Sequence, residues 1–536
     1  MDFSTLDFIV FGAYCVLILA TGLFVSRDKD GHEKNSEDYF LASKSLPWWA
    51  IGASLIAANI SAEQFIGMSG SGFALGLAIA SYEWMAAITL LIVGKFFLPI
   101  FIDKGLYTIP EFVEKRYSTN LKTILAVFWI ALYVFVNLSS VLYLGSLALE
   151  TIMGIPMMYG VIGLSLFAAA YSLYGGLSAV AWTDVIQVVC LVAGGLITTY
   201  LALNVVSDGT GVMAGFQQII DAAPDRFHMI LKKDNPQYSN LPGIWVLVGG
   251  LWVANIYYWG FNQYIIQRTL AAKSLEESQK GIALAAFLKL IIPFIVVVPG
   301  IAAYVMINDP EIMARLGEAG LQNMPGEGAS DKAYPWLLQL LPSGLKGIAF
   351  AALTAAVVSS LASMLNSTST IFTMDIYKPY INKNASEGQL VNVGRLTGVV
   401  SLVIACIMAP LLGGIDQAFQ FIQEYTGIVS PGILGVFLLG LFYKKSNNTA
   451  AIWGAILSVP IALAFKATTM PWMNQMGLTA VGTMILIIII SHITGKGEDD
   501  EKGIDVSGGI FKTNATFNIW AFVICILTAV LYALFW

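Results

Sequence analysis

Apolar runs of about twenty residues recur along this 536-residue chain, and a helix needs ~20 apolar residues to cross the hydrocarbon of a bilayer. Lipid offers no partner for backbone N–H and C=O groups, so each crossing segment must be a helix that satisfies its own hydrogen bonds. The chain is 57% hydrophobic and only 12% charged, whereas a soluble domain carries about 25% charged residues. These features predict an all-α integral membrane protein.

The runs predict about fourteen transmembrane helices. Their expected limits are 5–26, 47–74, 79–102, 122–149, 157–174, 180–206, 243–268, 278–307, 340–376, 391–412, 417–442, 449–467, 473–493 and 515–536. The first run has an acidic flank and no small-residue cleavage site after it, so we expect a retained span and not a signal peptide. The ninth run is long and rich in hydroxyl groups, which suggests a broken or strongly tilted helix.

Lysine and arginine are concentrated in alternate loops. With the N-terminus outside, the inside loops carry most of the basic residues, among them Lys104, Lys115 and Arg268. Positive charge marks the inner side of a membrane protein, so both termini are expected outside. The two long outside loops, 207–242 and 308–339, and the acidic run 498–501 are expected to be solvated.

Two of the predicted spans contain polar or glycine-rich interruptions. The second has Asn59 to Gln64 followed by several glycines, and the seventh runs from Gly249 to Gly260. Interrupted helices at matching places in two halves indicate the binding site of a transporter. The alternative is that the glycines only allow close helix packing.

The spacing of these two spans predicts one transmembrane domain, 1–536, with an inverted five-helix repeat. The expected parts are a peripheral helix and inside loop at 1–46, repeats at 47–206 and 243–442, and peripheral helices at 449–536.

Charged residues within spans are expensive and usually face a cavity or each other. Lys289, Glu83 and Asp184 are of this kind. Lys289 and Glu83 could form a structural ion pair, or a neutral polyol could bridge them, because a hydroxyl donates to carboxylate and accepts from ammonium.

The ninth span places Ala356, Ser359 and Ser360 on one helix face. Neutral oxygens of this kind suit a small hard cation, and carbonyls freed at the break near Ala57 and Ile60 could complete its shell. The alternative is that the serines bond back to the preceding turn.

Aromatic residues near the breaks suit a sugar, which has an apolar face and a hydroxyl rim, although aromatic residues in spans more often serve packing or lipid belts. An enzyme is disfavoured, because the three histidines fall in loops or at a span end and no metal or nucleotide motif is present. The net charge of −6 disfavours a nucleic-acid partner.

The stretch from Gly260 to Ser274 resembles the signature of the sodium:solute symporter family. The stretches 57–64, 174–184 and 359–368 match in the same order, and the likeness covers essentially the whole chain. Within the family, the chain is similar to the sodium/glucose cotransporter branch and its bacterial galactose-transporting members.

This resemblance implies sodium-coupled symport of a neutral monosaccharide, galactose or glucose, into the cell by alternating access. It implies sodium as coupling ion, no organic cofactor, and a place in the plasma membrane, which is the inner membrane in a bacterium. Another small solute, such as an amino acid or carboxylate, and a transporter-like sugar sensor are the alternatives.

The resemblance also assigns expected roles to residues. Substrate contacts would come from Gln64, Glu83, Asn255, Lys289, Gln423 and Tyr258. Gates would be Met68, Tyr82, Phe419 and Trp259. Sodium would lie on Ala57, Ile60, Ala356, Ser359 and Ser360, with Asp184 on its exit path. Ala86 stands where the branch has a serine, so one hydrogen bond to the sugar is expected to be missing.

Overall fold

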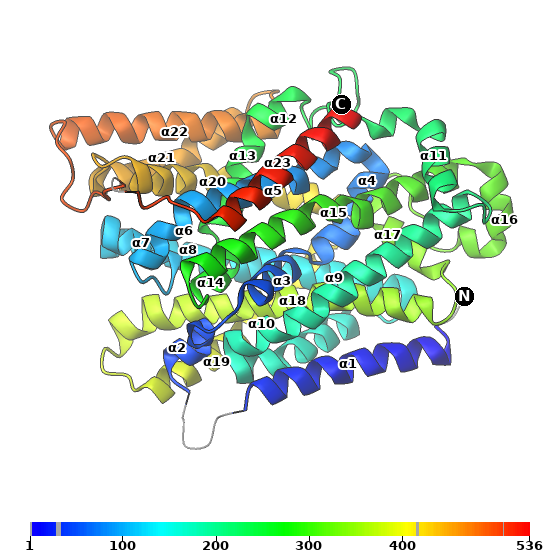
Figure 1. The fold of residues 1–536 in the computed structure, drawn as a ribbon, viewed down its shortest axis with the longest axis horizontal. Coiled ribbons are helices and arrows are strands. Elements are labelled where there is room, and N and C mark those ends of the chain that lie inside the picture. The colour runs from blue at the N-terminus through cyan, green and yellow to red at the C-terminus, as the bar shows by residue number, and fades with distance from the viewer. Residues whose placement is uncertain (1–2, 28–33, 414–416, 507–508) are drawn as a thin grey trace.

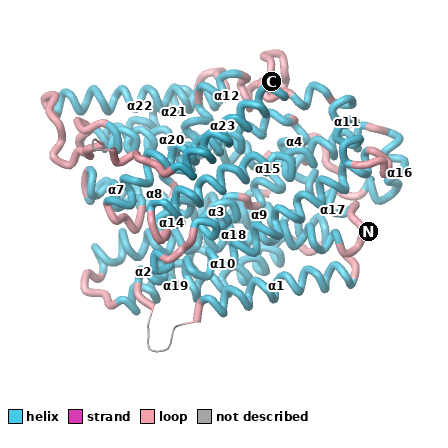
Figure 2. Tube along the Cα trace, viewed as in Figure 1, coloured by secondary structure: helices cyan, strands magenta, loops and turns pink. Residues whose placement is uncertain are grey.

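The computed structural model describes residues 3–27, 34–413, 417–506 and 509–536. Over these residues the fold is helical throughout, with helices that run mostly along the long axis of the molecule (Figures 1 and 2). The described residues contain one β contact, the isolated bridge between Leu46 and Ala272. The expected all-α architecture is therefore confirmed.

The first half of the chain forms ten α-helices. They are α1 Thr5–Val25, α2 Ser36–Leu41, α3 Trp48–Asn59, α4 Ser69–Leu75, α5 Ser81–Ile92, α6 Leu98–Asp103, α7 Ile109–Arg116, α8 Thr119–Ala131, α9 Ser139–Met153 and α10 Met157–Val206. Wide π-helical turns at Glu63–Met68, Val93–Phe97 and Leu132–Leu138 join neighbouring helices.

The second half adds thirteen α-helices among the described residues. They are α11 Val212–Ala222, α12 Ile244–Val248, α13 Gly250–Phe261, α14 Gln263–Leu270, α15 Leu275–Asn308, α16 Pro310–Leu321, α17 Ala333–Gln339, α18 Leu345–Ile371, α19 Glu387–Met408, α20 Ala418–Phe442, α21 Asn448–Lys466, α22 Trp472–Thr494 and α23 Ala515–Leu534.

Eleven helical stretches in the described part of the chain are long and apolar enough to cross a membrane. One of them, α10, has 50 residues, which is about 75 Å at 1.5 Å per residue and too long for a single crossing. It turns at Gly176, where φ is +62° and ψ is −152°, a conformation that glycine adopts without steric cost. The second and seventh predicted spans are divided into shorter helices, so the total of fourteen crossings stays a prediction.

The ninth predicted span was expected to be broken or strongly tilted. From Leu345 to Ile371 it is one continuous helix, α18, so the broken alternative is wrong. α18 continues through a wide turn at Phe372–Ile381. Several of its hydroxyl groups donate to the carbonyl one turn earlier, as Ser363 does to Ser359 O at 2.7 Å and Thr368 to Met364 O at 2.8 Å. Such bonds let a helix carry many serines and threonines in an apolar environment.

In Figure 1 the N-terminus lies at the right edge of the molecule and the C-terminus at its top. Asp7 accepts the backbone N–H groups of Gly344 and Gly347 at 2.7 Å, and Phe535 O accepts the N–H of Met229 at 2.7 Å. Met229 belongs to the first long loop, 207–242, and Gly344 follows the second, 308–339. The second loop is not simply a solvated cap, because α17 buries Trp336 completely.

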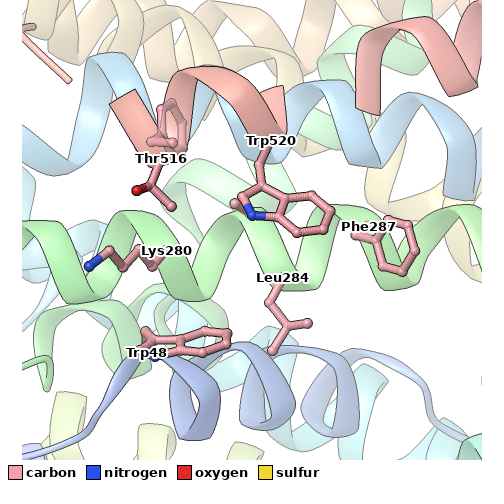
Figure 3. Close-up of a pocket in the computed structure, with 8 residues that line it drawn as sticks. Trp48, Lys280, Leu284, Phe287, Thr516 and Trp520 are labelled. Atoms are coloured by element: carbon pink, nitrogen blue, oxygen red, sulfur yellow. The ribbon is translucent and has the colours of Figure 1, made fainter. Parts of the chain in front are cut away.

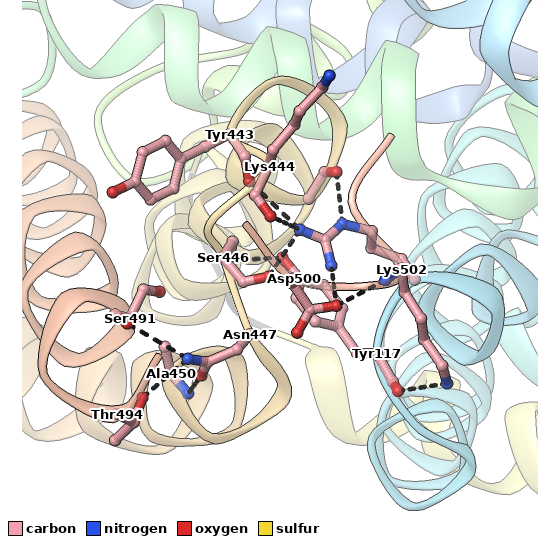
Figure 4. A network of polar contacts seen from close by, with 12 residues as sticks. Tyr117, Tyr443, Lys444, Ser446, Asn447, Ala450, Ser491, Thr494, Asp500 and Lys502 are labelled. Carbon is pink, nitrogen blue, oxygen red and sulfur yellow. Dashed lines mark hydrogen bonds and ion pairs between the residues drawn. The ribbon is translucent and has the colours of Figure 1, made fainter. Parts of the chain in front are cut away.

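Arg116 joins α7 to the end of α20. Figure 4 shows Tyr117, Ser446, Asp500 and Lys502 of the same polar network. The buried guanidinium of Arg116 donates to Gly440 O at 2.9 Å and Ser446 O at 2.6 Å, and lies 3.4 Å from Asp500. Lys502 donates to Tyr117 O at 2.9 Å. The acidic run 498–501 was expected to be a solvated loop. Glu498, Asp499 and Glu501 are exposed, and Asp500 is partly buried beside the guanidinium of Arg116.

Candidate functional site

The second predicted span breaks after α3. Ile60 has extended backbone (φ −78°, ψ 95°), and the next residues form the wide turn that begins at Glu63. The N–H of Ser61 donates to the side-chain oxygen of Gln64 at 3.0 Å. In a continuous helix this N–H would bond to Ala57 O, so the side chain of Gln64 frees the Ala57 carbonyl from its helical donor.

The seventh predicted span breaks twice. Gly249 (φ −123°, ψ −128°) separates α12 from α13, and Asn262 (φ −92°, ψ 121°) separates α13 from α14. The second break is braced by Tyr133, whose hydroxyl donates to Asn262 and accepts the N–H of Gln263 at 2.9 Å. The sequence placed the interruption between Gly249 and Gly260, and so located the first break and missed the second.

A cavity of about 50 Å³ lies between these two broken helices, α5, α15 and α20. It brings together residues that are far apart in the sequence. The lining consists of Asn59, Glu63, Gln64, Tyr82, Glu83, Ala86, Ala254, Asn255, Tyr258, Trp259, Lys289, Phe419 and Gln423. All six residues expected to contact substrate are in this set, as are three of the four expected gates; Met68 is buried outside the lining.

Lys289 and Glu83 form an ion pair in the cavity wall. Lys289 also donates to the side-chain oxygen of Asn59, and its ammonium lies 5.0 Å from the ring centre of Trp259. Lys289 and Glu83 are 1% and 3% exposed, so both charges have left bulk water. A buried pair is a costly way to stabilise a fold, and charges at such a position in a membrane protein usually serve function.

Aromatic side chains border the cavity in two places. The hydroxyl of Tyr258 accepts from Asn59 at 2.9 Å and from Tyr264 at 2.5 Å, and its ring packs edge-on against Trp259. Tyr82 and Phe419 make a second edge-on pair, with ring centres 5.0 Å apart.

The side-chain nitrogen of Asn255 is buried without a hydrogen-bond partner among the described residues. Because buried polar groups are normally paired, this amide is a natural donor to a polar ligand.

The serine face of α18 meets the broken end of α3. Ser360 donates to Ala58 O at 2.9 Å, and Ser359 donates to Asp184 at 2.5 Å. Neither of these contacts is the back-bonding that was the alternative explanation. Ala356 lies within an uninterrupted helix, so no break frees its carbonyl. Only its second lone pair is available to an ion.

Asp184 is paired with Arg268, and both side chains are fully buried. Arg268 donates to Ser54 at 2.6 Å and also to Ser363. The sequence placed Arg268 in an inside loop. The structure corrects this, because the break at Asn262 starts a separate short helix, α14, whose residues are all buried.

The family comparison agrees with this geometry. The profile described as "Sodium:solute symporter family" matches residues 39–458. This chain belongs to the sodium:solute symporter family. The symporter is thus a multi-pass membrane protein of a transporter family, and sodium is its coupling ion.

Curated relatives of the symporter include a bacterial and several mammalian proteins. A sodium/glucose cotransporter of Vibrio parahaemolyticus is 65% identical over 99% of this chain and 98% of its own length. Sodium/glucose cotransporter 4 of Mus musculus is 33% identical over 94% of this chain and 77% of its own length.

Among solved structures, the symporter is similar to a sodium-coupled sialic acid symporter in a substrate-bound outward-open state. The TM-score is 0.79 at 24% identity, over 92% of this chain and 98% of that one. At this identity the likeness shows a shared fold.

Five residues had no site role in the sequence analysis: Asn59, Glu63 and Ala254 line the cavity, and Ser61 and Arg268 lie beside it. Asn59 and Ser61 stand inside the polar interruption of the second span, which was the available signal. Arg268 gave no signal of its own, because a basic residue near the end of a span resembles a loop charge.

Proposed function

We propose that the symporter carries a neutral monosaccharide, galactose or glucose, into the cell together with sodium. The observation that carries this proposal is the Glu83–Lys289 pair in a cavity between two broken helices. The name of the 65% identical relative, a sodium/glucose cotransporter, supports the same substrate class.

Sugar hydroxyls complement the polar groups of the cavity. They donate to Glu83 and accept from Lys289 and the unpartnered amide of Asn255, while Gln64 and Gln423 add further polar contacts. Glu83 and Lys289 neutralise each other, and Glu63 adds a further carboxylate to the lining, which disfavours an anionic amino acid or carboxylate. The methyl group of Ala86 lines the cavity without offering a hydrogen bond.

Sodium binds between α3 and α18 in this proposal. The carbonyls of Ala57 and Ile60 and the hydroxyls of Ser359 and Ser360 supply neutral oxygens, and Ala356 contributes the free lone pair of its carbonyl. Asp184 contacts Ser359 directly, so it can receive the ion on its way out.

The last residues of α3 couple sodium binding to sugar binding in this proposal. Residues 57 and 58 face the sodium side, where Ser360 contacts Ala58. Asn59 and Gln64 face the sugar cavity. An ion that orders this segment also preorganises the sugar contacts, so less ordering free energy is lost when sugar binds. The same coupling raises sodium affinity when sugar is present, because coupling free energy is reciprocal.

Alternating access then depends on the two aromatic borders. Tyr258, backed by Trp259, is the inner gate, and Met68, Tyr82 and Phe419 cover the outer side. Tyr258 is bonded to Asn59 at the end of α3, so a change in this segment reaches the gate directly. Both termini face outside in this proposal, and the repeats are 47–206 and 243–442.

Uptake into proteoliposomes tests the function. Labelled galactose, glucose, a neutral amino acid and a carboxylate are compared with and without an inward sodium gradient. We expect gradient-driven accumulation of a monosaccharide alone. Sugar binding without accumulation would favour a sensor, and accumulation of a different solute would reject the sugar assignment.

A further inference from the structure

A second hollow, separate from the transport cavity, lies on the outer surface of the helix bundle. It is a groove of about 350 Å³ between the start of α3, the start of α15 and the start of α23. α15 and α23 run side by side from these starts toward the part of the molecule that holds α11 and the C-terminus (Figure 1). The groove is lined mainly by Trp48, Lys280, Leu284, Phe287, Thr516 and Trp520 (Figure 3).

The groove has a polar end and an apolar end. Lys280 and Thr516 lie at one end, and Phe287 and Trp520 lie toward the other (Figure 3). The rings of Phe287 and Trp520 pack edge-on with centres 5.7 Å apart. From Lys280 to Phe287 the groove follows α15 for seven residues, about 10 Å. This is less than the ~15 Å half-thickness of the hydrocarbon, so the groove runs from the membrane boundary into one leaflet.

The polar end carries charges of both signs. The ammonium of Lys280 lies 2.7 Å from the carboxylate of Glu276, and both side chains are partly exposed. A second carboxylate, Glu277, accepts the N–H of Trp48 at 2.8 Å. A tryptophan at the membrane boundary is itself suited to the headgroup region.

We propose that this groove is a binding site for phosphatidylethanolamine. The lipid phosphate accepts from Lys280 and the hydroxyl of Thr516, and the primary ammonium of the headgroup donates to Glu276. One acyl chain lies along Leu284, Phe287 and Trp520. The choice of lipid follows from charge, because a headgroup with one cation and one anion matches a lysine beside a glutamate.

Other common lipids match the groove less well. The headgroup of phosphatidylglycerol is anionic and has no cation for Glu276. The quaternary ammonium of phosphatidylcholine has no N–H to donate to a carboxylate. The predicted order of binding is therefore phosphatidylethanolamine first, with the other two weaker.

Native mass spectrometry of the purified symporter tests this order. The protein is titrated with the three lipids, all with the same acyl chains, and the bound fraction is compared in the wild type, Lys280→Ala, Trp520→Ala and Lys466→Ala. Lys466 is the matched control, because it also forms an exposed pair with a glutamate, Glu424, at 3.6 Å, and lies on α21 away from the groove.

We expect Lys280→Ala to weaken binding of phosphatidylethanolamine about fivefold, because the variant loses one hydrogen bond to the lipid phosphate. Trp520→Ala should also weaken it, and Lys466→Ala should not. Equal retention of the three lipids, stronger retention of phosphatidylglycerol, or no difference between Lys280→Ala and Lys466→Ala would overturn the proposal. All three substituted side chains are at the surface, so a common size-exclusion profile checks that each protein is folded.

Discussion

Gln64 accepts the backbone N–H of Ser61 through its side-chain oxygen at 3.0 Å. The hydroxyl of Ser61 donates to the same oxygen at 3.1 Å. One side chain in the proposed sugar cavity thereby holds open the helix break that exposes Ala57 O to the proposed sodium site. The two sites share a structural element, and this relationship leads to the first prediction.

Gln64→Leu should weaken sodium binding even in the absence of sugar. Without the side-chain acceptor, the N–H of Ser61 returns to Ala57 O, and the ion loses a ligand at a cost of about 1–1.5 kcal/mol, or roughly tenfold in affinity. The rise in melting temperature on addition of sodium measures this affinity without a transport assay. Gln64→Glu keeps an acceptor and should retain most of the sodium affinity. Equal losses of sodium affinity in the two variants would show that the hydrogen bond from the N–H of Ser61 to the side chain at position 64 is not the cause.

Ser360→Ala should weaken sodium dependence and leave sugar binding largely intact at high sodium. The loss of one hydroxyl ligand should cost on the order of 1–3 kcal/mol of ion affinity. Uptake against sodium concentration gives the half-saturation, and an unchanged value in both Ser359→Ala and Ser360→Ala would remove these residues from the site.

Equilibrium sugar binding across sodium concentrations tests the coupling of sodium and sugar binding. The proposed coupling is wrong if wild-type sugar affinity is the same at zero and saturating sodium.

Tyr258→Ala should reduce transport more than Tyr258→Phe does. Phenylalanine keeps the ring that stacks on the sugar but loses the hydroxyl that accepts from Asn59 and Tyr264. The initial rate of sugar uptake should therefore fall in the order wild type, Phe, Ala. If Phe proved as damaging as Ala, the hydroxyl links would be the essential feature and the stacking role would be wrong.

Removal of one member of the Glu83–Lys289 pair should destabilise the fold. Lys289→Met leaves a buried carboxylate without its partner, at an expected cost of about 3–5 kcal/mol. The double variant Glu83→Gln, Lys289→Met should recover much of that loss while transport stays absent. Thermal unfolding in detergent measures the stability of the wild type, the single variants and the double variant. If the loss of stability in the double variant equalled the sum of the two single losses, the two charges would not stabilise each other.

Arg116→Ala should destabilise the protein more than Asp500→Ala does. The guanidinium satisfies several carbonyls at the end of α20, and each buried acceptor left without a donor costs about 1–3 kcal/mol. Asp500 is partly exposed, so its pair with Arg116 contributes less. The melting temperatures of the two variants decide this. A larger fall in Asp500→Ala would point to the ion pair in place of the carbonyl bonds.

Hydropathy and charge in the sequence predicted the membrane-spanning class, the limits of most spans and the two interrupted helices. They did so because lipid offers no hydrogen-bond partner, so a span must be a continuous run of apolar residues in a helix. Such a run is visible within a short window of sequence. The resemblance to a family then supplied the expected site residues. Neither source predicted that α18 is continuous, because a run of hydroxyls is compatible with both a broken and an intact helix.

The partners of the key side chains were decided by tertiary structure. Lys289 could have faced any polar group in the bundle, and it contacts Asn59, 230 residues away in the sequence, as well as Glu83. Arg268 has the sequence context of a loop charge, and it is buried against Asp184, 84 residues away. The sequence alone determined that these charges were too costly to leave in lipid. Only the packing of distant helices decided which group would neutralise each one, because that choice depends on which side chains the fold brings within hydrogen-bond distance.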